Sequence, residues 1–82
     1  MENMEDKMNL IVDYIEGHLT DQVNQDRIAQ IAGFSYFDVG RIFSLIAGIG
    51  ISDYIRKRRM TLAGNELKFY NAKVIDVALK YG

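Results

Sequence analysis

The sequence predicts an all-α domain of five helices, and three observations support that fold class. Segment 28–33 (IAQIAG) recurs in similar form as segment 77–82 (VALKYG). Each copy is typical of the last turns of a short amphipathic helix that ends at a glycine, the first half of a helix-turn-helix. The chain has no proline and seven glycines, which suits helices joined by short turns. Apolar residues recur at helical spacing elsewhere, and no segment is predicted to be a strand.

Length and composition restrict the class of protein. Eighty-two residues make one small domain, and 49% hydrophobic with 26% charged residues argues against disorder. The chain has no cysteine, which excludes a disulfide scaffold and a thiolate-metal site. The apolar runs are too short to span a membrane, and the acidic start of the chain is unlike a targeting signal. We therefore expect a cytoplasmic protein.

The first two helices are predicted from apolar spacing and end signals. A helix over residues 4–19 is followed by a connection over residues 20–23. Asn24 is a plausible N-cap for a short second helix that ends at Gly33. We expect Ala29 to lie where this helix crosses the next, because a close crossing needs a small residue. The apolar residues of the first helix are Met8, Ile11, Val12, Ile15 and Leu19.

Three more helices follow the Gly33 turn. Ser35 caps the third helix, with Asp38 completing an approximate capping box, and the segment 48–50 (GIG) ends it. Its predicted apolar stripe is Val39, Ile42, Phe43 and Ile46.

Ser52 is the predicted cap of a long fourth helix, with Asp53 favourably placed for the helix dipole. This helix ends near residues 70–71, and the fifth helix covers residues 72–81. The predicted buried side of the fourth helix is Ile55, Leu62, Ala63 and Leu67.

Charge is unevenly distributed along the chain. Residues 1–26 hold seven acids and one lysine, whereas residues 27–82 hold nine bases and four acids. This split indicates one face turned toward a polyanion and one turned away. A solvated bipolar surface with no such partner is the alternative.

The sequence does not favour an enzyme. His18 is the only histidine, so neither a Ser-His-Asp set nor a multi-histidine metal site can form. The glycines match no phosphate-loop pattern. We therefore predict no catalytic residue, no cofactor and no metal.

Several motifs together resemble the AraC/XylS-type transcription regulators, over residues 8–82. Segment 43–48 (FSLIAG) particularly resembles members whose DNA-binding domain precedes a GyrI-like ligand-binding domain. The resemblance implies two helix-turn-helix units joined by a linker helix, each reading a major groove of double-stranded DNA. The matching residues are Ile28, Ala29, Gly33, Ser35, Arg41, Ile42, Phe43, Gly48, Tyr54, Ile55, Arg56, Arg58, Arg59 and the tail 74–82.

The resemblance also implies which residues face DNA. Arg41 is the best candidate base reader, because guanidinium pairs with guanine O6 and N7; a surface ion pair with Asp38 is the alternative. Tyr36 or Phe37 would meet a thymine methyl or a sugar, or else cover the edge of the core. The DNA-facing positions of the family fall on Ser35, Tyr36, Phe37, Gly40 and Arg41.

Three departures from the family indicate weak base-specific contact. Gly40 stands where members commonly carry a polar reader, Asp38 brings an anion near the phosphates, and Ser44 replaces a frequent lysine.

Four consecutive bases occupy residues 56–59 of the linker helix. Successive helical residues point about 100° apart, so the four cannot all face one phosphate strand. We interpret Arg56 and Lys57 as phosphate contacts and Arg59 as mainly structural.

These inferences combine into one hypothesis and two rivals. We expect a transcription regulator fragment over residues 1–82, with a first helix-turn-helix over 1–50, a linker helix over 51–71 and the start of a second unit over 72–82. It would have no effector domain in this chain and would bind DNA weakly, mostly through phosphates. One rival is a protein–protein interaction or dimerisation module, and the other is an inert truncated fragment. The dimer would form through apolar residues left uncovered on the fifth helix, namely Val74, Val77, Ala78 and Tyr81.

Overall fold

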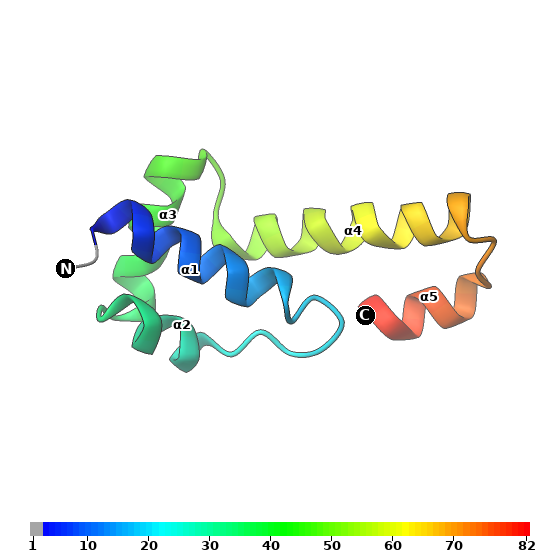
Figure 1. Cartoon of the computed structure of the whole chain (residues 1–82), viewed down its shortest axis with the longest axis horizontal. Helices are drawn as coiled ribbons and strands as arrows, with labels where there is room; N and C mark the ends of the chain where they lie inside the picture. The colour runs from blue at the N-terminus through cyan, green and yellow to red at the C-terminus, as the bar shows by residue number, and fades with distance from the viewer. Residues whose placement is uncertain (1–2) are drawn as a thin grey trace.

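The computed structural model describes residues 3–82, which form five α-helices and confirm the predicted all-α class. Helices α1, α2 and α3 pack together at one end of the molecule, α4 extends away from them, and α5 folds back beside α4 (Figure 1). The molecule is therefore elongated, with extents of 44 × 22 × 21 Å. The helices are α1 (Met4–Glu16), α2 (Gln25–Ala32), α3 (Tyr36–Ala47), α4 (Ile51–Phe69) and α5 (Val74–Tyr81).

Local capping interactions define the helix-turn-helix as predicted. The Asn24 side chain accepts a hydrogen bond from the Arg27 amide at 3.1 Å, and the Ser35 hydroxyl accepts one from the Asp38 amide at 3.2 Å. Gly33 ends α2 with φ of 76°, a left-handed conformation that favours glycine. These contacts are between residues close in sequence, and they fix where α2 ends and α3 begins.

Three predicted helix boundaries are wrong. Helix α1 ends at Glu16, three residues early, although Leu19 is still buried in the turn that follows. Helix α4 begins at Ile51 with Gly50 as its N-cap, so Ser52 lies inside the helix and makes no capping bond. Helix α4 starts earlier in the sequence than predicted because the Ile51 side chain is buried in the core.

The start of α5 is the third corrected boundary. Asn71 adopts a left-handed backbone with φ of 52°, a conformation that asparagine tolerates better than most residues. The chain therefore stays non-helical until Lys73, the N-cap of α5.

One buried apolar cluster joins α1, α2 and α3 to the first residue of α4. Its fully buried large side chains are Ile11, Ile15, Ile28 and Val39. Each provides about 1.5–3 kcal/mol of hydrophobic stabilisation on burial. Ile55 and Leu62 of α4 pack against the edge of this cluster.

The fully buried small residue of α2 is Ala32, and the predicted crossing of α2 and α3 at Ala29 stays a prediction. Ala32 is fully buried in the cluster, whereas Ala29 is half-buried and lies outside it. Ile28 and Ala32 are four residues apart and share one helix face, so the face that contains Ile28 also buries Ala32.

Two residues predicted to be buried are exposed instead. Ile46 is 62% exposed, because it falls in the last turn of α3 beside the loop that leads to α4. Leu67 is also exposed, because α4 extends past the three-helix bundle (Figure 1).

Helix α5 packs on α4, and polar side chains join the two helices. The Glu66 carboxylate accepts hydrogen bonds from the Lys80 ammonium and, at 2.9 Å, from the Tyr81 hydroxyl. Of the four residues predicted to form uncovered apolar surface, Val77 is buried and Tyr81 half-buried, whereas Val74 and Ala78 are exposed. Folding back on α4 therefore covers part of the predicted surface.

We predict that Ala32→Leu destabilises the fold by about 1–3 kcal/mol, because three added heavy atoms overpack a full core. Ala29→Leu is the matched control and should cost less, since its side chain is only half-buried. Urea unfolding followed by circular dichroism measures both changes. Equal losses in the two variants would contradict the difference in burial between Ala32 and Ala29.

Candidate nucleic-acid interface

Helix α3 has a buried face and an exposed face. Val39 and Phe43 are buried in the core, whereas Phe37 is 72% exposed and Arg41 is exposed on the opposite side. The Gly33 turn and the Ser35 cap hold the N-terminus of α3 directly after α2. This is the arrangement of a helix-turn-helix, in which the second helix presents its free face to DNA.

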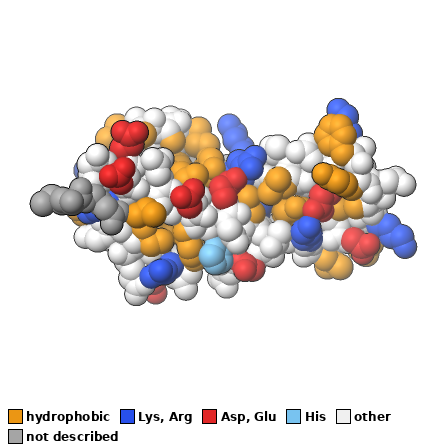
Figure 2. Space-filling view, in the orientation of Figure 1, with side chains coloured by type: hydrophobic (Ala, Val, Ile, Leu, Met, Phe, Trp, Pro, Cys, Tyr) orange, Lys and Arg blue, Asp and Glu red, His pale blue; other side chains and the backbone are white. Residues whose placement is uncertain are grey.

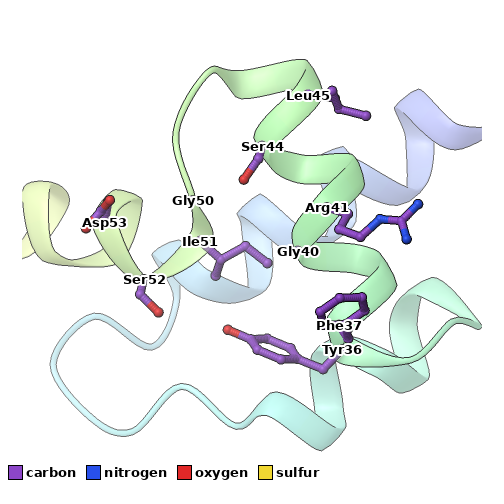
Figure 3. Close-up of a pocket in the computed structure, with 10 residues that line it drawn as sticks. All are labelled: Tyr36, Phe37, Gly40, Arg41, Ser44, Leu45, Gly50, Ile51, Ser52 and Asp53. Carbon is purple, nitrogen blue, oxygen red and sulfur yellow. The ribbon is translucent and has the colours of Figure 1, made fainter.

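The exposed face of α3 continues into a shallow depression of about 730 Å³ beside the start of α4 (Figure 3). Four predicted DNA-facing residues lie together here. The lining residues are Tyr36, Phe37, Gly40, Arg41, Ser44, Leu45, Gly50, Ile51, Ser52 and Asp53.

Helix α4 is held beside α3 by an aromatic contact. The ring of Phe43 meets the ring of Tyr54 edge-on, with centroids 5.7 Å apart. Such pairs contribute about 0.5–1.5 kcal/mol beyond burial. The contact fixes the side of the depression that α4 forms.

Arg41 is oriented outward, away from α4 (Figure 3). Its guanidinium lies over the Phe37 ring, 5.9 Å from the centroid. Among residues 3–82 it makes no ion pair with Asp38, so the alternative interpretation of a surface ion pair is not realised. The guanidinium therefore keeps its hydrogen-bond donors at the surface.

The two neighbouring aromatic residues differ in burial. Tyr36 is half-buried and packs against the core cluster, so it covers the edge of the core. Phe37 is exposed and faces outward. The Ser35 hydroxyl is engaged as a helix cap.

Gly40 leaves open space on the α3 surface. A Cβ added at this position would meet nothing within 4 Å, so packing within the chain does not require glycine here. A glycine inside a helix costs about 1 kcal/mol relative to alanine. Without a side chain at this position, the α3 backbone is exposed on this side of the depression.

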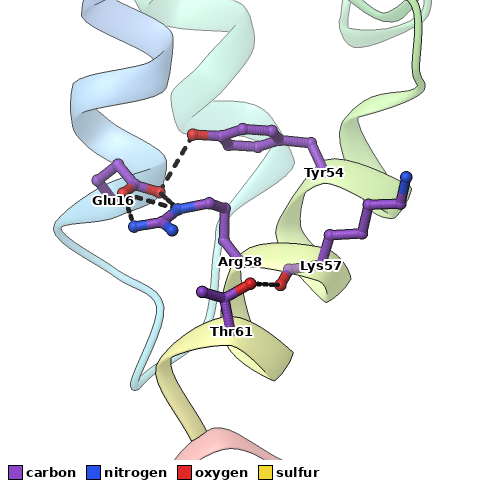
Figure 4. A network of polar contacts seen from close by, with 5 residues as sticks. All are labelled: Glu16, Tyr54, Lys57, Arg58 and Thr61. Carbon is purple, nitrogen blue, oxygen red and sulfur yellow. Dashed lines mark hydrogen bonds and ion pairs between the residues drawn. The ribbon is translucent and has the colours of Figure 1, made fainter. Parts of the chain in front are cut away.

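Neither Arg56 nor Lys57 lines the depression, although Arg56 contacts Asp53, which does. Arg56 pairs with Asp53 at 2.7 Å, and both side chains are largely exposed. Arg56 lines a second groove, between α4 and α5. The Lys57 side chain extends away from the Glu16–Arg58 pair (Figure 4). Four of the seven predicted residues thus line the depression; Ser35 adjoins them as the cap of α3, whereas Arg56 and Lys57 are on α4.

Arg59 has the structural role that was predicted. Its Nε donates to the Leu19 carbonyl at 3.0 Å, and a terminal nitrogen donates to the Asp21 carbonyl at 2.8 Å. These bonds tie α4 to the turn that follows α1.

A second anchor of α4 was not predicted from the sequence. The Arg58 guanidinium binds the Glu16 carboxylate with its closest contact at 2.7 Å, and the Tyr54 hydroxyl donates to the same carboxylate at 3.2 Å (Figure 4). Forty-two positions separate Glu16 and Arg58, and no local pattern connects residues so far apart.

This contact shifts three pKa values. The hydrogen bond from Arg58 lowers the pKa of Glu16 below its usual value. Burial raises the pKa of Tyr54, and the adjacent Glu16 charge adds to the rise. The hydrogen bond to Glu16 raises the pKa of Arg58. The charged Glu16–Arg58 pair is therefore the favoured state near neutral pH.

Charged side chains of both signs reach the surface. Figure 2 shows acidic and basic side chains on both the three-helix end and the α4–α5 arm, with apolar side chains exposed between them. Within residues 3–82, no helix is long and apolar enough to cross a membrane. Within the same residues, no group of three or more His, Cys, Asp or Glu side chains is placed to hold a metal ion.

Several curated proteins similar to this chain are named as regulators. The HTH-type transcriptional activator AarP of Providencia stuartii is 44% identical over 71 residues, which are 87% of this chain and 53% of AarP. Regulatory protein SoxS of Escherichia coli (strain K12) is 31% identical over 72 residues, 88% of this chain and 67% of SoxS. No family model matches the chain.

A longer relative is the right origin-binding protein of Escherichia coli (strain K12). It is 34% identical over 68 residues, which are 83% of this chain and 24% of that protein. The chain thus spans about half the length of AarP and about a quarter of the right origin-binding protein. AarP and SoxS are named as regulators and not as enzymes.

We predict that acid weakens the fold through Glu16. Its pKa is lower in the folded chain, so its stabilising contribution is complete above the unfolded pKa and is lost as pH falls through the folded pKa. About a third of each side chain in the Glu16–Arg58 pair is exposed, and solvent screening limits the contribution to about 1 kcal/mol.

Urea unfolding between neutral pH and the acid range measures this loss. Glu16→Gln should be less stable than wild type at neutral pH and should lose less stability on acidification. Glu5→Gln, at an exposed glutamate of the same helix, controls for the change in net charge. Identical acid profiles for wild type and Glu16→Gln would contradict the prediction.

Proposed function

Because this chain belongs to the AraC family of helix-turn-helix transcription regulators, we propose that it binds double-stranded DNA with α3 in a major groove. The proposed domain plan has a first helix-turn-helix over residues 1–50, a linker helix over 51–71 and the start of a second unit over 72–82. The observation that supports groove insertion best is the outward face of α3, where Phe37 and Arg41 are exposed and directed away from the core.

Each proposed contact residue has a defined role. Arg41 pairs with guanine O6 and N7 in the groove, and Phe37 meets a thymine methyl or a sugar. Arg56 and Lys57 on α4 contact phosphates, although Asp53 partly neutralises Arg56. Ser35 and Tyr36 mainly hold α3 in place, through the cap and through the core edge.

We propose that binding is weak and dominated by phosphates. Arg41 is the single cation on α3, Gly40 has no side chain with which to read a base, and Asp38 repels phosphates in the first turn. A net charge of −1 adds no long-range attraction. Phosphate-dominated contact of this kind has dissociation constants of about 10⁻⁴ to 10⁻⁶ M at physiological salt.

Fluorescence anisotropy with a labelled 20-base-pair duplex tests the proposal. We expect a Kd in that range and a linear fall in log affinity with log salt concentration, as counterion release requires. Absence of binding at low salt would overturn the proposal, and nanomolar sequence-selective binding by a monomer would contradict its weak form.

Arg41 variants separate its charge from its hydrogen-bond geometry. Arg41→Lys keeps one charge but loses the planar fork that matches guanine, so it should keep the salt dependence and lose discrimination between guanine-containing and guanine-free duplexes. Arg41→Ala should lose the discrimination and also reduce the salt slope by about one unit. Unchanged discrimination in both variants would remove Arg41 from the interface.

A dimerisation module is the second candidate, supported by α5. This helix carries three large apolar side chains that are each at least 67% exposed, namely Val74, Ile75 and Leu79. Clustered apolar surface of this kind is typical of an interface. Sedimentation velocity over a range of concentrations should show a dimer that Val74→Lys abolishes. A monomer at every concentration would exclude this candidate.

A further inference from the structure

Leu45 is an exposed leucine on the proposed DNA-facing side of α3. It is 85% exposed, more than any other large hydrophobic residue described. It lies four residues after Arg41 and eight after Phe37, on the same broad face of the helix. Figure 3 shows its side chain directed to the same side as that of Arg41, away from α4.

Leu45 has no packing role within residues 3–82. It is neither part of the buried cluster nor among the half-buried side chains that pack against it, unlike its neighbour Ile42. Replacing a leucine that is so exposed should change the stability of the folded protein very little. Its position beside Arg41 on the depression is therefore the feature that needs an explanation.

The chemistry of leucine restricts its partner in a major groove. Leucine neither donates nor accepts hydrogen bonds, so it cannot read a base by polar contact. The apolar group that base pairs present in the major groove is the 5-methyl group of thymine. A thymine methyl is therefore the complementary partner for an exposed leucine there.

Helical geometry gives the spacing between the bases that Arg41 and Leu45 reach. Four residues advance about 6 Å along an α-helix, and base pairs are about 3.4 Å apart. One turn of α3 therefore corresponds to roughly two base-pair steps. Gly40 and Ser44, which are small, lie on the other edge of this face and allow α3 to approach closely.

We propose that Leu45 is a specificity-determining residue that contacts a thymine methyl roughly two base pairs from the guanine bound by Arg41. This inference rests on the proposed insertion of α3 into a major groove. The preferred DNA is thus one in which guanine and thymine occur at that spacing. The added preference is modest and is superimposed on phosphate-driven binding.

The test begins with selection from a randomised duplex pool at low salt, using the full chain. The enriched duplex is then synthesised with deoxyuridine in place of each thymine in turn, which removes one methyl group and leaves base pairing intact. For wild type, one such replacement near the enriched guanine should weaken binding about four-fold, the effect of one methyl-sized apolar contact.

Leu45 variants assign that effect to the side chain. Leu45→Ala should bind the thymine and deoxyuridine duplexes equally, because it no longer reaches the methyl group. Leu45→Met, which keeps an apolar chain of similar length, should retain most of the four-fold difference. Thermal unfolding of both variants should match wild type, given the exposure of Leu45.

Three outcomes separate the two proposals. Absence of salt-dependent binding to any duplex overturns the proposed function itself. Binding without a thymine-to-deoxyuridine effect overturns only the role of Leu45. A thymine effect that persists unchanged in Leu45→Ala assigns the methyl contact to another residue and likewise overturns the inference.

Discussion

Burial of one face of α1 is the constraint on which the rest of the molecule depends. Ile11 and Ile15 are fully buried, and α2, α3 and the start of α4 all contribute to the same cluster. A chain of this size has little other apolar area to bury. The position of α3, and therefore of Arg41, follows from contacts on the far side of the helix. The proposed interface needs no strained backbone of its own, because its exposed face is what remains after the core has formed.

The four consecutive bases of α4, residues 56–59, have different partners in the folded chain. Arg58 pairs with Glu16, and Arg59 binds two backbone carbonyls near the end of α1. Arg56 pairs with Asp53 on its own helix. Among the described residues, Lys57 is the one base of this run whose side chain makes neither an ion pair nor a hydrogen bond. Two of the four charges thus hold the fold together, which lowers the charge available to a polyanion and agrees with the weak binding that we propose.

Local signals were predicted well, and contacts between distant segments were not. The caps at Asn24 and Ser35 and the turn at Gly33 involve residues within a few positions of each other, so their chemistry is visible in the sequence. Ser52 carried an equally good capping signal, but burial of Ile51 moved the start of α4. Periodicity identified the buried faces but not how far along each helix the core extends, so the burial of Ile46 and Leu67 was wrongly predicted. Four of the predicted contact residues lie together because all are on α3, whereas the positions of Arg56 and Lys57 depend on the tertiary path of α4.

The length of α4 has a mechanical consequence. Its contacts with the core end near Leu62, and the helix continues to Phe69, an overhang of about 10 Å. The first half of α4 is held by its contacts with the core, and the overhang extends from it together with α5. A tilt of about 10° there displaces the far end by roughly 2 Å, more than half the 3.4 Å step between base pairs. In the proposed DNA-bound state, such a tilt would change the position of the far end of α4 relative to the DNA without any change in the three-helix bundle.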